Sequence, residues 1–342
     1  MKITRICLER FTAFEELDFM PSPGVNVLAG ANGTGKTHLM KVAYAACDVT
    51  KTRQPLGEKL VSAFLPSGGA LGRLVKRRSE SSTARVFVEW NHEQSVEMTF
   101  SNHIKEPTHA KVAVEWLPKG QRGDIEAVFI PVKEMLANAP GFRSLYARRE
   151  VHFESVYADI IDRAYLPVLR GKRFGAQRSM LMDLQEVMAG KVLVKNEEFF
   201  LKNSSGELEF SLLAEGLRKL GLLWLLIQNG TLAAGSVLFW DEPEANLNPR
   251  LFRAVVRILL TLQEQGVQIF VSTHDYSVVK EFELAATEAH QVRYHVLYHD
   301  PVDQHVRMES SDEAFSLSHS PIAHAMSGLY DRQIRKVLGA ER

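Results

Sequence analysis

The chain has little cysteine, no excess of charge of either sign and no long apolar run, and each shortage excludes a class of protein. Of 342 residues only Cys7 and Cys47 are cysteines, so we expect neither a disulfide framework nor a zinc site. Lysine plus arginine equals aspartate plus glutamate at 41 each, so no global field attracts nucleic acid or a membrane surface. No stretch approaches about eighteen uninterrupted apolar residues, and the N-terminus lacks a signal-peptide pattern. We therefore expect a cytoplasmic protein with no membrane partner.

One dense motif stands out in this unremarkable composition. Residues 30–37 fit the phosphate-binding pattern G-x-x-x-x-G-K-[ST]. In such a loop, glycines let backbone N–H groups turn toward phosphate oxygens, the lysine reaches the β- and γ-phosphates, and the hydroxyl ligates Mg²⁺. An apolar strand precedes the loop and helical spacing follows it, so the phosphates would lie at a helix N-terminus. The sequence therefore predicts a Mg-nucleotide site made by Gly30, Ala31, Asn32, Gly33, Thr34, Gly35, Lys36 and Thr37.

A second apolar run, residues 237–240, ends in the carboxylates Asp241 and Glu242. Phosphoryl transfer needs an acid that helps to hold Mg²⁺, and Asp241 fits that role. It also needs a base that positions water for attack on the γ-phosphate, and Glu242 fits that one. The alternative is a strand that leads into an acidic helix start. The Pro-Glu-Ala-Asn-Leu-Asn-Pro segment that follows favours the catalytic interpretation.

The rest of the chain alternates between strand and helix patterns. Residues 48–83 look irregular, whereas 133–189 have helical periodicity that is broken near Pro167 and Gly171. Further helices are expected at 216–228 and from Pro249 to about residue 265. Strands are expected at 2–9, 15–20, 24–29, 85–90, 95–100, 111–116, 127–131, 191–194, 198–202, 207–210, 236–240, 267–272 and 291–298.

Several of these segments carry a resemblance to a known family. Residues 241–249 resemble the Walker B motif and D-loop of ABC-type ATPases, and residues 271–275 resemble their switch-histidine loop around His274. The stretches at 129–134, 141–146 and 214–219 are typical of stand-alone bacterial AAA-family ATP-binding proteins of the RecF, SMC and OLD-nuclease branch. The resemblance implies an α/β P-loop NTPase of the ABC-ATPase head type, with an antiparallel β subdomain and a helical insert.

On this pattern we expect four parts. Residues 1–47 and 191–300 would form the ABC-type ATPase core, and residues 48–132 an irregular segment plus the antiparallel β subdomain. Residues 133–190 would form the helical insert, and residues 301–342 a C-terminal extension.

The resemblance also implies a mechanism, in which two heads form a homodimer around two ATP molecules. Each ATP would lie between one phosphate loop and the partner's signature loop, here residues 213–219. Where the family has a serine, this chain has Ala214, so the contact across the dimer would fall to the Gly216 N–H and Arg218, and slow hydrolysis is expected. His274 would sense the γ-phosphate; the alternative is a buried structural histidine. The Q-loop residue would be Lys133 or Glu134.

The leading functional hypothesis is a Mg-ATP-binding and hydrolysing switch in DNA transactions or antiphage defence, with a separate effector of the nuclease or toxin type. One alternative is a nucleotide-gated scaffold with negligible turnover, and another is a transporter ATPase subunit. Basic clusters at 73–78, 143–149 and 170–178 allow DNA binding, although a solvated surface offset by nearby acids is the preferred interpretation at zero net charge. The histidines after residue 289 lack metal-ligand spacing, and the acids after residue 299 lack the strands of a nuclease site.

Overall fold

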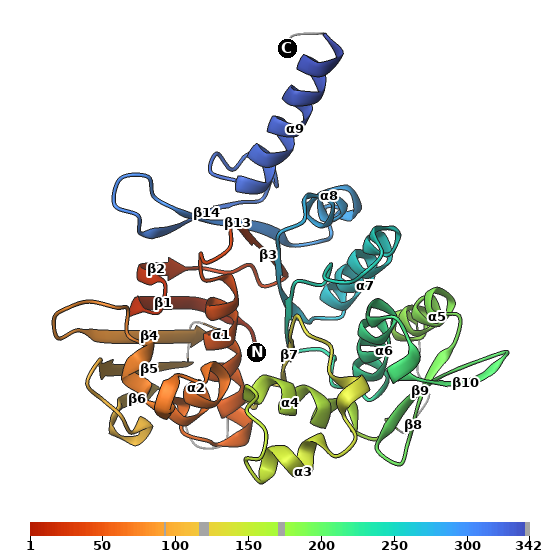
Figure 1. Cartoon of the computed structure of the whole chain (residues 1–342), viewed down its shortest axis with the longest axis horizontal. Helices are drawn as coiled ribbons and strands as arrows, with labels where there is room; N and C mark the ends of the chain where they lie inside the picture. Colours follow the sequence, from red (N-terminus) through yellow and green to blue (C-terminus); the bar gives the residue numbers. More distant parts are fainter. Residues whose placement is uncertain (92–93, 116–122, 170–174, 339–342) are drawn as a thin grey trace.

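A computed structural model of the chain describes residues 1–91, 94–115, 123–169 and 175–338 (Figure 1). Its centre is a six-stranded sheet in the order β14-β13-β3-β12-β11-β7. Five of these strands are parallel neighbours, and β14 pairs antiparallel with β13 at one edge. The strands are β3 (Val25–Gly30), β7 (Ala127–Ile130), β11 (Val237–Asp241), β12 (Gln268–Thr273), β13 (Val292–His299) and β14 (Val306–Ser311). The α/β fold class is therefore confirmed.

A second sheet is antiparallel and has the order β2-β1-β4-β5-β6. Its strands are β1 (Ile3–Phe11), β2 (Phe14–Phe19), β4 (Thr83–Trp90), β5 (Gln94–Ser101) and β6 (Lys111–Glu115). Burial alternates along β4, because successive side chains point to opposite faces and only one face meets the core. The strands predicted at 2–9, 15–20, 85–90, 95–100 and 111–116 are confirmed. The predicted end of the last one, Trp116, lies outside the described residues.

Helix α1 (Lys36–Thr52) belongs to the hydrophobic layer between the two sheets, and α2 (Leu56–Phe64) packs beside it. Side chains of the core strands alternate between this layer and the opposite one. On β11, for example, Phe239 faces α1 whereas Trp240 faces the other layer. Both faces of the core strands are thus covered, which explains why β3, β11 and β12 are largely apolar and buried at every position.

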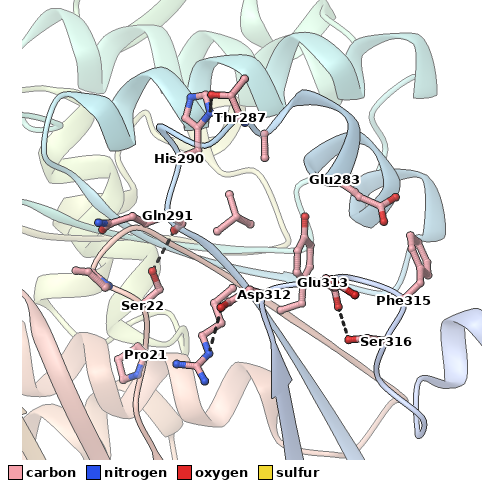
Figure 2. A pocket seen from close by; sticks show the side chains of 15 residues that line it. Pro21, Ser22, Glu283, Thr287, His290, Gln291, Asp312, Glu313, Phe315 and Ser316 are labelled. Carbon is pink, nitrogen blue, oxygen red and sulfur yellow. Dashed lines mark hydrogen bonds and ion pairs between the residues drawn. The ribbon is translucent and has the colours of Figure 1, made fainter.

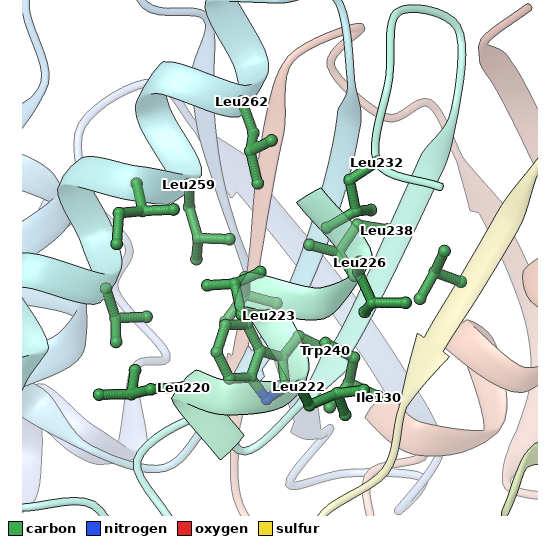
Figure 3. Close-up of a cluster of buried hydrophobic side chains, with 14 of the residues drawn as sticks. Ile130, Leu220, Leu222, Leu223, Leu226, Leu232, Leu238, Trp240, Leu259 and Leu262 are labelled. Carbon is green, nitrogen blue, oxygen red and sulfur yellow. The ribbon is translucent and has the colours of Figure 1, made fainter. Parts of the chain in front are cut away.

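The opposite layer is made by α6 (Glu215–Gln228), α7 (Phe252–Glu264) and α8 (Tyr276–Ala285). Figure 3 shows leucines of α6 and α7 packed against Leu238 and Trp240 of β11. A short 3₁₀ turn, Pro249–Leu251, leads into α7; the Asn248 side chain accepts a bond from the Arg250 N–H at 3.0 Å, and the proline takes the first helical position. The helices predicted at 216–228 and from Pro249 to about residue 265 are confirmed, whereas α8 was not predicted.

The remaining elements lie at the periphery. The insert contains α3 (Phe142–Ala147), α4 (Ser155–Ala164) and α5 (Ala176–Met188), as its periodicity predicts; the predicted break at Gly171 lies outside the described residues. A small sheet of β8 (Lys191–Lys195), β9 (Glu198–Asn203) and β10 (Gly206–Glu209) follows. Helix α9 (Pro321–Val337) extends away from the body in Figure 1.

Three sequence-based assignments were wrong. The segment 48–83, predicted irregular, carries the end of α1 and the whole of α2, because Leu56, Leu60 and Ala63 lie on one buried face. β7 was assigned to the β subdomain but pairs with β11 in the core sheet, since both of its faces are covered. The core also extends past residue 300, because β14 adds a strand to β13.

A histidine inside the core is structural. His295 of β13 is fully buried, and its ring nitrogens contact Ser310 Oγ at 2.7 Å and Asn26 Oδ1 at 3.1 Å. Burial lowers the pKa of His295 to about 3. In the described residues, no three His, Cys, Asp or Glu side chains are grouped so that they could hold a metal ion.

This burial predicts a pH dependence of stability. The folded protein keeps His295 neutral to about pH 3, whereas an unfolded histidine takes up a proton near pH 6.5. Stability is therefore lost as the pH falls below about 6.5, by about 2 kcal/mol at pH 5 from this residue. Urea unfolding at pH 7 and pH 5 should show this loss in the wild type and a smaller one in His295→Gln. His324→Gln, on the exposed face of α9, serves as control. Equal losses in all three proteins would contradict the assignment.

The α6 layer predicts a large effect of truncation. Leu223 has 0% exposure, and Leu223→Ala should lower the free energy of unfolding by about 3 kcal/mol, because a cavity remains. Leu329→Ala, at 50% exposure on α9, makes the same chemical change at the surface and should change it by less than about 0.5 kcal/mol. Urea denaturation of both variants checks this, and similar losses would show that α6 is not part of the main core.

Candidate nucleotide site

Three adjacent parallel strands end at one edge of the core sheet. Asp241 at the end of β11 pairs with Ser272 of β12, and Thr273 of β12 pairs with Ala29 of β3. The phosphate loop, the two carboxylates and the His274 loop therefore emerge side by side. Carboxyl ends of parallel strands are where open α/β sheets bind ligands.

Two glycines of the phosphate loop occupy positions that no other residue fits. Gly30 has φ +148°, and a Cβ there would lie 2.3 Å from the Leu297 carbonyl oxygen of β13. Gly35 has φ +91°, and a Cβ there would lie 2.7 Å from the Phe14 ring of β2. The loop is thus fitted between the core sheet and the hairpin of the antiparallel sheet, and α1 starts at the next residue.

Lys36 turns its ammonium group back into the loop. Nζ donates to the carbonyl oxygens of Gly30 at 2.7 Å and Ala31 at 3.0 Å. Burial lowers the pKa of Lys36 to about 8, and the charges of Glu242 and Asp241 partly oppose this. Phosphate oxygens at the loop would favour the charged ammonium form.

Thr37 and Asp241 form the part of the site that fits a divalent cation. Thr37 Oγ1 donates to Asp241 Oδ2 at 2.9 Å, and Ser272 Oγ donates to the other carboxylate oxygen. Burial raises the pKa of Asp241, while the bonds from Ser272 and Thr37 lower it. A hydroxyl and a carboxylate in contact next to a phosphate loop are the oxygen donors that Mg²⁺ prefers.

Glu242 and His274 make the opposite side of the site. His274 Nε2 lies 2.6 Å from Glu242 Oε1, and its Nδ1 lies 3.2 Å from the Gly30 carbonyl oxygen. Glu242 has φ +48°, a left-handed conformation that turns it away from the line of β11. Both side chains are about one-third exposed, so they face an open space rather than the core.

That space is an open pocket of about 300 Å³. It is lined by Asn32, Gly33, Gly35, Lys36, Thr37, His38, Glu242 and His274. Seven of these eight residues were predicted, five in the phosphate loop and the other two as Glu242 and His274, whereas His38 was not predicted. His38 directly follows Thr37 on α1, and its ring packs against Phe64 of α2 at 5.3 Å between centroids.

The predicted signature loop lies at the start of α6, outside this lining. Gly216 packs against the D-loop, since a Cβ there would lie 2.8 Å from the Asn246 carbonyl oxygen. Arg218, predicted to contact ATP of a second protomer, is paired within its own chain: Nε lies 2.8 Å from Glu134 Oε2, and Nη1 donates to the Phe210 carbonyl. Ala214 is exposed at the helix start.

The two candidates for the Q-loop residue differ in their surroundings. Glu134 has a fully buried side chain that accepts a bond from the Leu136 N–H and faces Arg218, and burial raises its pKa. Lys133 is exposed. Glu134 therefore connects the segment after β7 to α6 and does not line the pocket.

Sequence reasoning missed two side chains next to the site. Glu244, in the D-loop, accepts bonds from the Thr273 hydroxyl and the His274 N–H. Lys219 of α6 donates to the Ala245 carbonyl oxygen at 2.6 Å. Glu244 and Lys219 each stand in a stretch that resembles the family, and their charge was the only signal in the sequence. Their contacts could not be predicted, because their partners lie more than 20 residues away in the chain.

A larger pocket of about 880 Å³ lies at the other edge of the sheet (Figure 2). Its walls come from the loop before β3, the loop between α8 and β13, and the segment after β14. The first two walls are joined by a hydrogen bond that Ser22 Oγ donates to the Gln291 carbonyl at 3.0 Å. The larger pocket lies at the amino ends of the parallel strands, whereas open α/β sheets bind ligands at the carboxyl ends. The smaller pocket, which the phosphate loop lines, is therefore the candidate nucleotide site.

Several residues of the predicted basic clusters are paired with acids in the part of the chain that the structure describes. Lys76 and Arg78 both contact Glu15, and Arg143 contacts Asp162. Arg170, Lys172 and Arg173 lie outside the described residues. Among the described helices, none combines the length and apolar content needed to cross a bilayer.

Comparisons with known proteins agree with this geometry. The family described as "AAA domain, putative AbiEii toxin, Type IV TA system" matches residues 114–280. The DNA replication and repair protein RecF of Lachnoclostridium phytofermentans is 24% identical over 244 residues, which cover 66% of this chain and 62% of that protein. The energy-coupling factor transporter ATP-binding protein EcfA of Methanothermobacter thermautotrophicus is 33% identical over 46 residues, 14% of this chain and 15% of that protein. The chain thus spans less than two-thirds of the length of either relative.

Solved structures share the fold. The SMC head bound to the C-terminal winged-helix domain of ScpA superposes with a TM-score of 0.56 at 12% identity, over 93% of this chain and all of that one. An SMC head with an extended coiled coil, bound to the C-terminal domain of ScpA from Pyrococcus furiosus, gives 0.51 at 9% identity, over 97% and 99%. The chain is a P-loop protein with the ABC-type head fold. Its sequence is similar to that of RecF over 66% of its length.

The contact of Thr37 with Asp241 predicts the metal dependence of nucleotide binding. Asp241→Asn replaces a carboxylate by a neutral amide, so the Mg²⁺ concentration for half-maximal binding of a fluorescent ATP analogue should rise by about tenfold or more. Binding without Mg²⁺ should change by less than about twofold, because the phosphate loop is untouched. Asp312→Asn, an exposed matched change, should behave as the wild type. An unchanged Mg²⁺ requirement in Asp241→Asn would remove Asp241 from the metal site.

Proposed function

We propose that the chain binds Mg-ATP in the pocket at the ends of β3, β11 and β12 and hydrolyses it slowly, as a nucleotide-driven switch that dimerises. The observation that carries this proposal is the convergence of Lys36, the Thr37–Asp241 pair and the Glu242–His274 pair on one open pocket. These groups come from three chain segments more than 30 residues apart, and each supplies a different requirement of phosphoryl transfer.

Each side chain has a role in the proposed reaction. Thr37 and Asp241 would hold Mg²⁺, which neutralises charge on the β- and γ-phosphates when it is bound. The Lys36 ammonium group would exchange its hydrogen bonds to the Gly30 and Ala31 carbonyl oxygens for bonds to the phosphate oxygens. Glu242 would accept a proton from the attacking water, and His274, already in contact with Glu242, would donate a hydrogen bond to the γ-phosphate.

The open site supports the proposal that the protein dimerises. The pocket has no cover from the chain's own signature loop, and Leu212 beside that loop is 69% exposed. A second copy could bring the start of its α6 over the nucleotide, with the Gly216 N–H as the phosphate contact. Leu212 and Ala214, which are exposed in the single chain, would then be buried in the dimer.

The cellular role is proposed from the relatives. RecF is named for DNA replication and repair, the solved SMC heads carry a bound ScpA domain, and the matching family is described with a toxin system. These names support a role in DNA transactions or antiphage defence with a separate effector of the nuclease or toxin type. The pairing of Lys76, Arg78 and Arg143 with acids weakens the case for direct DNA contact through those clusters.

A nucleotide-gated scaffold with negligible turnover is the second candidate. Two observations favour it: Ala214 has no hydroxyl for a contact across the dimer, and Arg218 is held by Glu134. A transporter subunit has less support, since the similarity to EcfA covers 46 residues.

Glu242→Gln tests the switch directly. Loss of the base should slow chemistry by about a hundredfold and trap ATP. Light scattering should then show one copy without nucleotide and two copies with Mg-ATP, whereas Lys36→Ala should stay monomeric under both conditions because the phosphates lose their cation. A mass of Glu242→Gln that does not respond to ATP would reject the homodimer.

The same two variants separate the switch from the scaffold. A scaffold needs bound ATP and no hydrolysis, so Glu242→Gln would keep biological activity whereas Lys36→Ala would abolish it. A hydrolytic switch loses activity in both variants. Steady-state phosphate release by the wild type, absent in Glu242→Gln, completes the distinction.

A further inference from the structure

The D-loop is bonded on both sides to elements of its own chain. On one side, Glu244 Oε1 accepts from Thr273 Oγ1 at 2.7 Å and from the His274 N–H at 2.9 Å. On the other side, the Ala245 carbonyl accepts from Lys219 Nζ at 2.6 Å, and Asn246 Nδ2 donates to Glu215 Oε2 at 2.9 Å. The segment thus connects the His274 loop to the first turn of α6.

Glu244 lies at a position where it controls one histidine. Its carboxylate binds the backbone N–H of His274, and the imidazole of the same residue contacts Glu242, two residues before Glu244 in the chain. These bonds close a small ring through Glu242, His274 and Glu244. The ring fixes the imidazole against the Glu242 carboxylate without any bond from Glu244 to the imidazole itself.

The carboxylate is held rather than solvated. Burial raises the pKa of Glu244, and its second oxygen, Oε2, is buried without a hydrogen-bond partner among the residues that the structure describes. Such a group costs stability, so a simple turn would be better made by a neutral side chain. Lys219 is itself 1% exposed and fixes the next residue, so the carboxylate has little freedom to turn away.

We propose that Glu244 is a positioning residue that holds the His274 loop, and with it the imidazole, against Glu242, and that Lys219 anchors the same segment to α6. This inference rests on the proposed function, because it explains how that site is held in order. A movement of α6 on dimer formation would reach His274 through Lys219, Ala245 and Glu244.

The test compares Glu244→Ala with Glu244→Gln. The alanine removes the acceptor for both bonds, so kcat should fall about tenfold while the Kd for ATP changes by less than about twofold, the pattern of a lost transition-state interaction. The glutamine keeps one carbonyl oxygen as acceptor and should restore kcat to within about threefold of the wild type. Glu283→Gln, a matched change in the exposed ion pair with Lys280 on α8, serves as control.

A double-mutant cycle separates positioning from general support of the fold. If Glu244 acts through His274, adding Glu244→Ala to His274→Ala should lower kcat by less than about twofold further. A full tenfold further loss in that background would overturn the proposal. So would a glutamine variant as slow as the alanine variant, or a Kd that rises in proportion to the fall in kcat.

A readout that does not need turnover keeps this test apart from that of the proposed function. In protein labelled with ¹⁵N-histidine, the His274 imidazole signals are assigned by their loss in His274→Ala. Glu244→Ala should shift these signals, while Glu283→Gln leaves them in place. Absence of ATP hydrolysis by the wild type would reject the proposed function alone, whereas unshifted His274 signals in Glu244→Ala would reject the positioning role.

Discussion

The register of β3, β12 and β11 is the constraint on which the site depends. The strands are parallel and start from a common edge, so the phosphate loop, the His274 loop and the Asp241–Glu242 pair all leave the sheet together. A slip of one residue in β11 would turn Asp241 toward the opposite face of the sheet, because side chains alternate along a strand. The apolar side chains of both layers fix this register, since they fit only one pairing.

Several charged groups next to the site are buried, and each has a specific compensation. Asp241 receives two hydroxyl groups, Lys36 two backbone carbonyls and Lys219 one. Burial without such partners would cost several kcal/mol for each charge. These hydrogen bonds also restrict the movement of the three side chains, because a buried charged group can move only to a place where another partner is available.

The contacts around the D-loop relate the local site to the larger assembly that we propose. α6 carries the predicted signature loop at its first turn, and its residues Glu215, Gly216 and Lys219 contact the D-loop. The D-loop in turn meets the His274 loop at Glu244. A partner that presses on the start of α6 therefore acts on elements already bonded to the Glu242–His274 pair. Arg218, held by Glu134, extends the same set of contacts to the segment after β7.

Features that depend on residues close together in the chain could be predicted without the structure. The phosphate loop, the strand that ends in Asp241 and Glu242, the N-terminal strand pair and α6 all follow from motifs or periodicities within about twenty residues. The candidate site residues Lys36, Thr37, Asp241, Glu242 and His274 could all be named in this way.

Contacts between segments far apart in the chain became known only from the tertiary structure. It gave β7 and β14 to the core sheet, folded α2 from a stretch that looked irregular, and paired Arg218 with Glu134 instead of leaving it free. It also brought Glu244 to His274, 30 residues away, and Gln268 to Ile3, 265 residues away. Such contacts cannot be predicted from local sequence patterns, because strand order and register determine which side chains are neighbours across a sheet. Strand order and register depend in turn on how the whole chain buries its apolar faces.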